Sequence, residues 1–273
     1  MAMIFLIVGE TAGNQRRGYR TSPVDSISKG ITNSLNNADR LAPDLANAIE
    51  KVDITLPGFS KKKNDEASPN VGADLTGQDF SGAQKPKEIF ASAQLTDTIF
   101  LGAQLDESSL EAAIGARTNF RKARMTESVL NAAAFTEANF EEANLRKASV
   151  RGAFVTDSNF TGADFLGTSF AGSDLSGSKL VDAFGAGSSF VGATLTDVDF
   201  ANTDLRTARF SRSTMKGASF TGADLGGADF ENANLTGASF EGALGMTQEQ
   251  LDLACGDDGT RLPEGLTVLS CAS

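Results

Sequence analysis

Large apolar residues recur at every fifth position from residue 71 to residue 245. Counting 75, 80, 85 and onward, this fifth position holds Phe, Leu, Met or Val in all but four units. The residue two places earlier is Ala, Ser or Thr in nearly every unit, and no residue is inserted or deleted over the whole range. The four units that lack a large apolar residue carry Lys85, Gly115, Gly185 and Gly245.

A period of five fits neither an amphipathic helix, with a period near 3.6, nor a half-buried strand, with a period of two. Strict self-similarity instead predicts a solenoid, in which each unit buries its apolar face only against its neighbours. A large and a small residue two positions apart point to the same side of an extended segment. The other three positions hold Gly, Asp, Asn, Thr, Ser, Lys or Arg, which suit a corner and solvent. Four such sides would close a square coil, so we expect an all-β solenoid of about nine coils.

The columns that this coil would create also favour four sides. Every twentieth residue from Phe80 to Phe240 is Phe, except Leu180. We expect a ladder of stacked rings on one side, with the spacing of about 4.8 Å that paired strands have. The side that contains Leu75, Leu95 and Leu235 is mainly aliphatic.

The repeat units read ADLGG, ADFEN and ANLTG from residue 223 to 237, and ANFEE and ANLRK from 138 to 147. This pattern resembles the pentapeptide-repeat family over residues 71–245. The resemblance implies a right-handed quadrilateral β-helix. Function is less constrained, because one fold supports many roles.

Residues 246–273 are expected to cap the open end of the solenoid. Thr247 and Gln250 have capping-box spacing for a helix over 248–254, with Gly256 at its C-cap. The stretch TQEQLDLACGD, from residue 247, resembles the caps of bacterial pentapeptide-repeat proteins. Cys255 and Cys271 fit either a disulfide or two plain thiols.

The first seventy residues lie outside the repeat and divide into three segments. Residues 1–21 form an apolar start and loop, read either as a buried terminal strand or turn or as a shortened export signal. Residues 22–60 form a helical extension that Pro43 divides, and residues 61–70 form a linker. The apolar stripe of the extension could dock on its own domain, dimerise or contact a membrane surface weakly. No run is long enough for a transmembrane helix.

Breaks in the repeat indicate where contacts are made. Lys85 and Glu88 would be buried in a regular coil, so we expect residues 85–88 to bulge outward. Ile114 and Phe184 each precede a glycine, and either turn inward to fill the gap or stay exposed. Three candidate contact residues, Ile114, Ala134 and Phe154, are spaced by twenty and should share one outer side, which receives the N-terminal helix or another chain. Phe184 is the fourth candidate.

Composition excludes most catalytic classes. The chain has no His, which removes histidine bases, histidine-dependent triads and histidine-ligated metals. No phosphate-binding loop or dinucleotide fingerprint is present. We therefore expect no catalytic, metal or cofactor-binding residue, and no cofactor.

The sequence favours a non-enzymatic structural or protein-interaction rod, with a homodimer as one option. The net charge of −11 disfavours direct binding of nucleic acid. The family resemblance implies the alternative, since pentapeptide-repeat proteins of the quinolone-resistance type mimic DNA and bind type II topoisomerases such as gyrase. The expected location is the cytoplasm, with the periplasm or a peripheral membrane position as alternatives.

Overall fold

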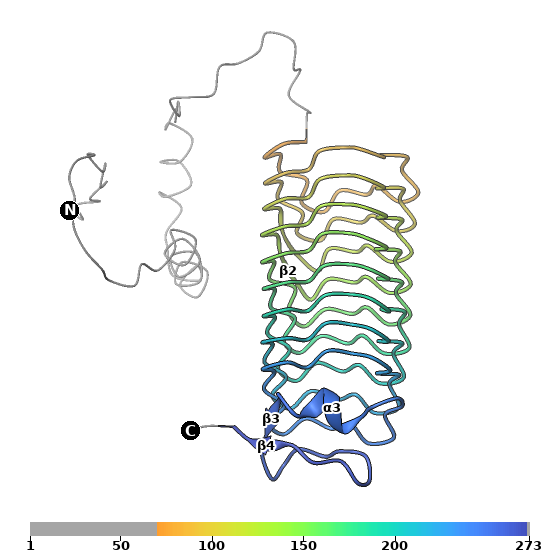
Figure 1. Cartoon of the computed structure of the whole chain (residues 1–273). Helices are drawn as coiled ribbons and strands as arrows, with labels where there is room; N and C mark the ends of the chain where they lie inside the picture. The colour runs from red at the N-terminus through yellow and green to blue at the C-terminus, as the bar shows by residue number, and fades with distance from the viewer. Residues whose placement is uncertain (1–69, 272–273) are drawn as a thin grey trace, which may run out of the picture. The chain divides into compact units, whose positions relative to one another are not determined.

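The computed structural model describes residues 70–271, which fall within the second of two compact units, Asp65–Ser273. The expectations for residues 1–69, namely the apolar start, the helical extension and the linker, lie outside the described residues. Figure 1 shows the described part as a stack of coils wound about one axis. The repeat region and the C-terminal cap together form this stack.

Parallel backbone pairing between residues twenty apart builds the stack. It runs on four sides, from Asp74↔Gln94 to Asp224↔Leu244. We number the four sides in chain order by their outward residues, which recur every twenty positions. Side 1 begins with residue 74, side 2 with residue 79, side 3 with residue 84 and side 4 with residue 89. Most pairings are single-residue bridges, so the fold is a quasi-β-helix. Two longer strands occur, β1 (Ile114–Ala116) and β2 (Ala134–Thr136), and they pair in parallel on side 1.

Each corner is a tight turn of one kind. The N–H of Ala83 donates to the carbonyl of Phe80 at 3.0 Å, and this bond repeats along the stack. The second corner residue has a φ between 53° and 71° at every unit from residue 72 to 242. A positive φ at only this position defines a type II turn, which favours Gly or Asn. Gly152 is typical, with a φ of 61° and open space around its α-carbon.

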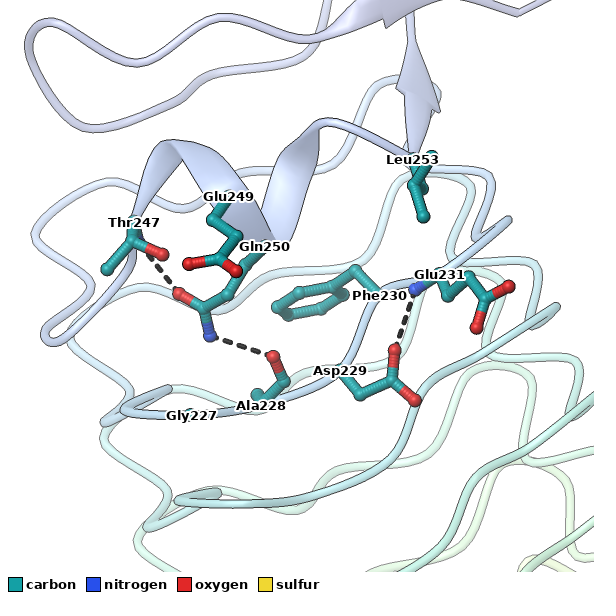
Figure 2. A pocket seen from close by; sticks show the side chains of 9 residues that line it. All are labelled: Gly227, Ala228, Asp229, Phe230, Glu231, Thr247, Glu249, Gln250 and Leu253. Atoms are coloured by element: carbon teal, nitrogen blue, oxygen red, sulfur yellow. Dashed lines mark hydrogen bonds between the residues drawn. The ribbon is translucent and has the colours of Figure 1, made fainter.

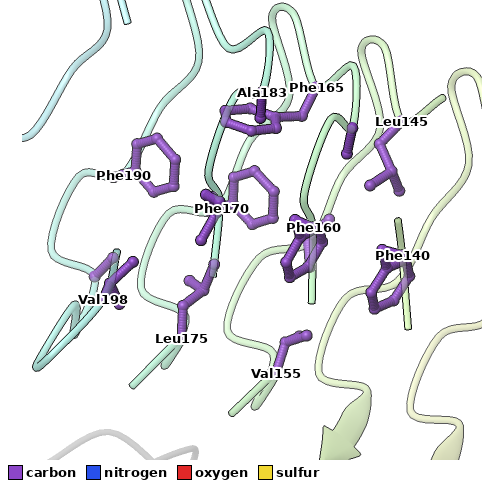
Figure 3. Close-up of a cluster of buried hydrophobic side chains, with 14 of the residues drawn as sticks. Phe140, Leu145, Val155, Phe160, Phe165, Phe170, Leu175, Ala183, Phe190 and Val198 are labelled. Atoms are coloured by element: carbon purple, nitrogen blue, oxygen red, sulfur yellow. The ribbon is translucent and has the colours of Figure 1, made fainter. Parts of the chain in front are cut away.

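The core consists of aromatic and aliphatic side chains in layers (Figure 3). The expected ladder on side 2 is present, with ring centroids 5.2 Å apart for Phe80 and Phe100 and 4.6 Å apart for Phe140 and Phe160. A second ladder, not expected from the sequence, runs up side 4. Its rings stack at 5.0 to 5.2 Å and comprise Phe170, Phe190, Phe210 and Phe230.

The expected bulge at residues 85–88 is wrong. Lys85 N–H donates to the Gln104 carbonyl at 2.9 Å, as a regular coil requires, and the corner keeps its turn. The ammonium of Lys85 and the carboxylate of Glu88 form an ion pair at 3.4 Å, with side chains 35% and 20% exposed. Both charges are tolerated because this first coil lies at the end of the stack, where no further coil of the repeat covers them.

Hydroxyl groups replace Ala at some small inward positions, and most of them are bonded. The Ser178 hydroxyl donates to the Val155 carbonyl at 2.9 Å and accepts the N–H of Ser158 at 3.0 Å. The Ser128 hydroxyl is fully buried and has no partner in the described structure. The two serines therefore occupy equivalent inward slots with opposite hydrogen-bonding status.

We predict that Ser178→Ala lowers the free energy of unfolding by about 1–3 kcal/mol, because it leaves the buried Ser158 N–H without an acceptor. Ser128→Ala should be neutral or stabilising, because it removes a buried hydroxyl that bonds to nothing. Urea unfolding of the two variants measures the difference. Equal destabilisation by both substitutions would contradict the assignment.

The C-terminal cap closes the last coil with side-chain hydrogen bonds. Helix α3 (Gln248–Leu251) places the Gln250 amide nitrogen 2.9 Å from the Leu225 carbonyl and 2.8 Å from the Ala228 carbonyl. Leu251 and Ala254 are buried in the core. These contacts cover apolar layers and backbone carbonyls that would otherwise end at solvent.

The cap differs from expectation in its helix and its glycine. The helix ends at Leu251 instead of residue 254, with Asp252 at the C-cap. Gly256 lies in strand β3 (Cys255–Gly256), where a Cβ would approach Thr260 and Val268 within 2.6 and 2.8 Å. Gly256 is therefore required by close packing, not by helix termination.

A disulfide joins Cys255 and Cys271 across sixteen residues. Strand β3 pairs in parallel with β4 (Leu269–Ser270), and Cys255 also pairs with Asn234 on side 1. The disulfide thus ties the end of the cap to a backbone ladder that continues from the repeat region.

We predict that Cys271→Ser, or reduction of the wild type, destabilises the cap by about 3 kcal/mol, because a loop of this length gains that much conformational freedom when opened. Denaturant unfolding with and without dithiothreitol measures the loss. The double variant Cys255→Ser/Cys271→Ser is the control, since dithiothreitol should not change its stability. No effect of the reductant on the wild type would refute the prediction.

Candidate protein-contact surfaces

Side 1 brings Ile114, Ala134 and Phe154 into one outward column. Strand register pairs Ile114 with Ala134, and a bridge pairs Ala134 with Phe154. The side chains of Ile114 and Phe154 are 39% and 41% exposed. The column therefore alternates a large, a small and a large apolar side chain at successive levels.

Ile114 and Phe184 point outward because the gaps beside their glycines are already filled. A Cβ at Gly115 would overlap the hydroxyl of Thr118, which donates to the Leu95 carbonyl at 2.8 Å. A Cβ at Gly185 would overlap the ring of Phe165, from one coil earlier. No space remains for an inward turn, which decides between the two alternatives that the sequence left open.

The residues two positions before and two positions after each member of the column carry no charge across three coils. We call this surface the side 1 patch. It consists of Ala112, Ile114, Ala116, Ala132, Ala134, Thr136, Gly152, Phe154 and Thr156. Charged side chains begin at the adjoining corner, where Asp97, Arg117, Glu137 and Asp157 are second corner residues of successive coils. The opposite corner carries Glu111 and Arg151. The patch is thus an uncharged strip between two charged edges, like the apolar centre and polar rim of a protein contact.

Phe184 lies on side 3, two sides away from side 1 and hence opposite to it. Its side chain is 57% exposed, and its backbone bridges Asp164 and Asp204. Asp164 pairs with Arg146 at 2.9 Å, and Asp204 pairs with Arg206 at 2.7 Å. Phe184 therefore projects between two ion pairs.

Leu166, which the sequence reading missed, adds to the Phe184 surface. Leu166 precedes Phe184 by eighteen residues. Asp106 and Arg124 have the same spacing on the same side, and their side chains are in contact. The side chain of Leu166 is exposed. The pattern alone could not single it out, because residue 166 is a variable corner position.

A hollow of about 470 Å³ lies beside helix α3 (Figure 2). Its polar groups already hold the cap together: Gln250 accepts the N–H of Thr247 at 2.7 Å, and Asp229 accepts the N–H of Glu231 at 2.9 Å. A second hollow of about 360 Å³ shares Leu253 with the first. Neither hollow directs a set of free polar groups toward one point, so neither resembles an active site.

Ion pairs between neighbouring coils neutralise many of the carboxylates. The guanidinium of Arg117 donates two bonds to Asp97, both at 2.8 Å, and lowers the pKa of that carboxyl. Within one coil, Arg206 lowers the pKa of Asp204 by hydrogen bonding, and it also approaches Asp224 of the next coil at 3.7 Å. Further pairs join Lys87 to Glu107, Arg121 to Glu141, Lys122 to Glu142, Arg124 to Asp106 and Lys147 to Glu127. Such exposed pairs contribute little stability, and their main effect is on the surface charge pattern.

The described part of the chain offers neither a metal site nor a membrane-spanning helix. No group of three or more His, Cys, Asp or Glu side chains could hold a metal ion there. No helix among residues 70–271 is long and apolar enough to cross a membrane.

The pentapeptide-repeat family model matches eight copies between residues 116 and 243, interrupted only at residue 185. The repeat region belongs to the pentapeptide-repeat family. This confirms the resemblance seen in the sequence. The ladder of pentapeptide repeats begins earlier than the matched residues, because pairing starts at Asp74.

Solved structures of pentapeptide-repeat proteins are similar to this chain. HetL, involved in heterocyst differentiation regulation in the cyanobacterium Nostoc, is 25% identical with a TM-score of 0.36, covering 69% of this chain and 87% of its own. QnrB1, a plasmid-mediated fluoroquinolone resistance protein, is 20% identical with a TM-score of 0.33, covering 70% and 90%. A protein of the Arabidopsis thaliana thylakoid lumen is 29% identical with a TM-score of 0.28, covering 47% and 69%. No curated protein sequence matches the chain.

Proposed function

We propose that this protein is a non-enzymatic interaction rod, which binds other proteins through the side 1 patch and through Phe184. The observation that carries the proposal is the exposure of Ile114, Phe154 and Phe184 outside a core that is already complete. Exposed apolar surface in a soluble protein commonly marks a contact site. An aromatic anchor beside arginines, as Phe184 is, has the composition of an interface hot spot.

The two contact surfaces lie on opposite sides of the coil, so two partners could bind at once without overlap. This geometry supports a scaffold role more than that of a single-site binding module. A right-handed β-helix of about nine coils, as the sequence predicts, would hold the two surfaces at a fixed separation.

The interior of the rod supports a non-enzymatic role. Its layers are filled by buried Phe, Leu and Ala side chains. In the hollow of about 470 Å³ beside the cap, Thr247 bonds to Gln250 and Glu231 bonds to Asp229. Catalysis would require polar groups that converge on a substrate.

The alternative is a DNA mimic that binds a type II topoisomerase, and the net charge of −11 favours it. The charge pattern weighs against it. Duplex DNA carries one charge per about 1.7 Å, or about 24 over the roughly 40 Å of the repeat, whereas residues 71–245 carry 22 acidic and 14 basic side chains, a net charge of −8. Arg206 also approaches both Asp204 and Asp224, at 2.7 and 3.7 Å. We therefore prefer the interaction rod.

Among the locations that the sequence leaves open, the disulfide between Cys255 and Cys271 favours an oxidising one such as a periplasm. Cytosolic thiols are normally kept reduced, and the cap would lose this covalent tie there.

We predict that Ile114→Asp/Phe154→Asp reduces partner recovery about tenfold or more, because a charge would be buried at the centre of the contact. Cross-linking of the intact protein in lysate of its source organism, followed by quantitative mass spectrometry, measures recovery. Thr194→Asp/Thr214→Asp is the matched control, with the same charge on the same side below the patch. Phe184→Asp tests the opposite surface separately. If Ile114→Asp/Phe154→Asp and Phe184→Asp both recover every partner as well as the wild type does, the proposal is excluded.

We predict that the purified protein does not inhibit DNA supercoiling by gyrase, because arginine and lysine side chains interrupt its acidic surface and pair with many of its carboxylates. A supercoiling assay over a range of protein concentrations tests this. Strong inhibition would favour the DNA-mimic alternative over the interaction rod.

A further inference from the structure

We propose that residues 262–271, which we call the strap, are a redox-sensitive closure of the C-terminal end of the stack. A dithiol reduces the disulfide between Cys255 and Cys271, and the strap then leaves the end of the stack while the coil beneath it stays intact. Reoxidation closes the strap again. Three features support this device: the few bonds that hold the strap, the separate bonds of the coil beneath it, and the position of the disulfide.

The strap runs from side 2, past helix α3, and back to side 1 (Figure 1). Just before it begins, Arg261 pairs with the last coil on side 2. Midway along the strap, Thr267 bonds to Gln248 of helix α3. At its end, Leu269 pairs with Cys255, which itself continues side 1. The strap therefore lies outside the last residues that continue the coil.

Few bonds other than the disulfide hold the strap in place. Its main chain pairs with the cap over the two residues of β4, and the Cys271 N–H donates to the Gly256 carbonyl at 2.9 Å. The Gln248 side chain accepts the N–H of Thr267 at 3.0 Å and donates to its carbonyl at 3.1 Å. The apolar side chains of the strap are only partly buried: Leu262, Leu266 and Val268. A short segment with so little burial opens at low cost once its covalent tie is cut.

The coil beneath the strap is held by bonds in which the strap takes no part. On side 1, the Cys255 N–H donates to the Ala233 carbonyl at 3.0 Å, and the Leu235 N–H donates to the Cys255 carbonyl at 2.7 Å. On side 2, the Arg261 N–H donates to the Ala238 carbonyl at 2.9 Å. Opening of the strap leaves these bonds in place. It also exposes a strand edge at the end of the stack, the kind of surface that accepts another strand.

The disulfide lies where a reductant can reach it. Both cysteines are partly exposed, and Cys255 lines the hollow of about 360 Å³ together with Leu253 and Leu269. A thiolate of the dithiol bonds to one cysteine sulfur, and the other cysteine leaves as a thiolate that takes up a proton. The second thiol of the reductant then displaces the first cysteine. The reductant ends as an intramolecular disulfide, and the protein ends with two thiols.

Side 1 also provides contacts that return Cys271 to its place. Its sulfur lies 3.4 Å from the side-chain oxygen of Asn234 and 3.6 Å from the hydroxyl of Thr236. Once reduced, the Cys271 thiol can donate to the Asn234 oxygen, and the Thr236 hydroxyl can donate to the sulfur. Hydrogen bonds of sulfur are weak, so these contacts guide closure without preventing opening.

Hydrogen exchange of the full chain, followed by mass spectrometry of peptic fragments, tests the switch. We expect exchange of the strap amides to rise at least about tenfold when dithiothreitol reduces the wild type. Residues 233–241 should keep their protection, and reoxidation with oxidised glutathione should restore the protection of the strap. Alkylation with iodoacetamide counts the free thiols in each sample.

Two variants serve as controls. The strap of Cys255→Ser/Cys271→Ser should exchange rapidly with or without dithiothreitol. Gln248→Ala removes the contact with helix α3 and keeps the disulfide, so its strap should stay closed when oxidised. An open strap in oxidised Gln248→Ala would contradict the proposal, because the glutamine would then be the group that holds it.

Unchanged exchange of the strap in fully reduced protein would overturn the proposal, because the disulfide would then not control closure. Loss of protection in residues 233–241 together with the strap would also overturn it, since the disulfide would then be a staple for the whole cap. The switch is equally refuted if dithiothreitol fails to reduce the native disulfide, or if reoxidation fails to close the strap.

Discussion

The backbone ladder between residues twenty apart is the constraint on which the rest of the structure depends. At each level, a residue such as Gln94 donates its N–H to one carbonyl of the coil before and accepts an N–H through its own carbonyl. Because every coil repeats these bonds on four sides, the register of one side fixes the register of the other three. Side-chain layers, corner geometry and surface columns all follow from that register.

The same constraint explains why the exceptions are accommodated locally. Gly115 and Gly185 keep their backbone bonds, and the space that a side chain would fill is taken by Thr118 and by the ring of Phe165. Lys85 also keeps its place in the ladder, and its charge is paired instead of being expelled. Losing a rung would leave backbone groups without partners, whereas a neighbouring side chain can adjust at small cost.

The sequence was sufficient to predict the coil, its four sides and the aromatic ladder of side 2, because a period of five that remains unbroken has few structural solutions. It could not predict the orientation of Ile114 and Phe184. That orientation depended on whether another side chain, from the same turn or from a different coil, already filled the space beside each glycine. It also misjudged the cap, where the backbone departs from the repeat and Gly256 is fixed by contact with Thr260 and Val268. Leu166 was missed because a corner position accepts almost any residue.

A ladder of fixed register makes distances along this molecule discrete. Twenty residues add one level of about 4.8 Å without rotating anything that follows, whereas five residues would turn every later surface by a quarter of a revolution. The separation between the side 1 patch and Phe184 can therefore change only in whole levels if the two surfaces are to stay opposite each other. The protein is in this sense a molecular ruler, graduated in coils, and length variation among related rods should occur in multiples of twenty residues.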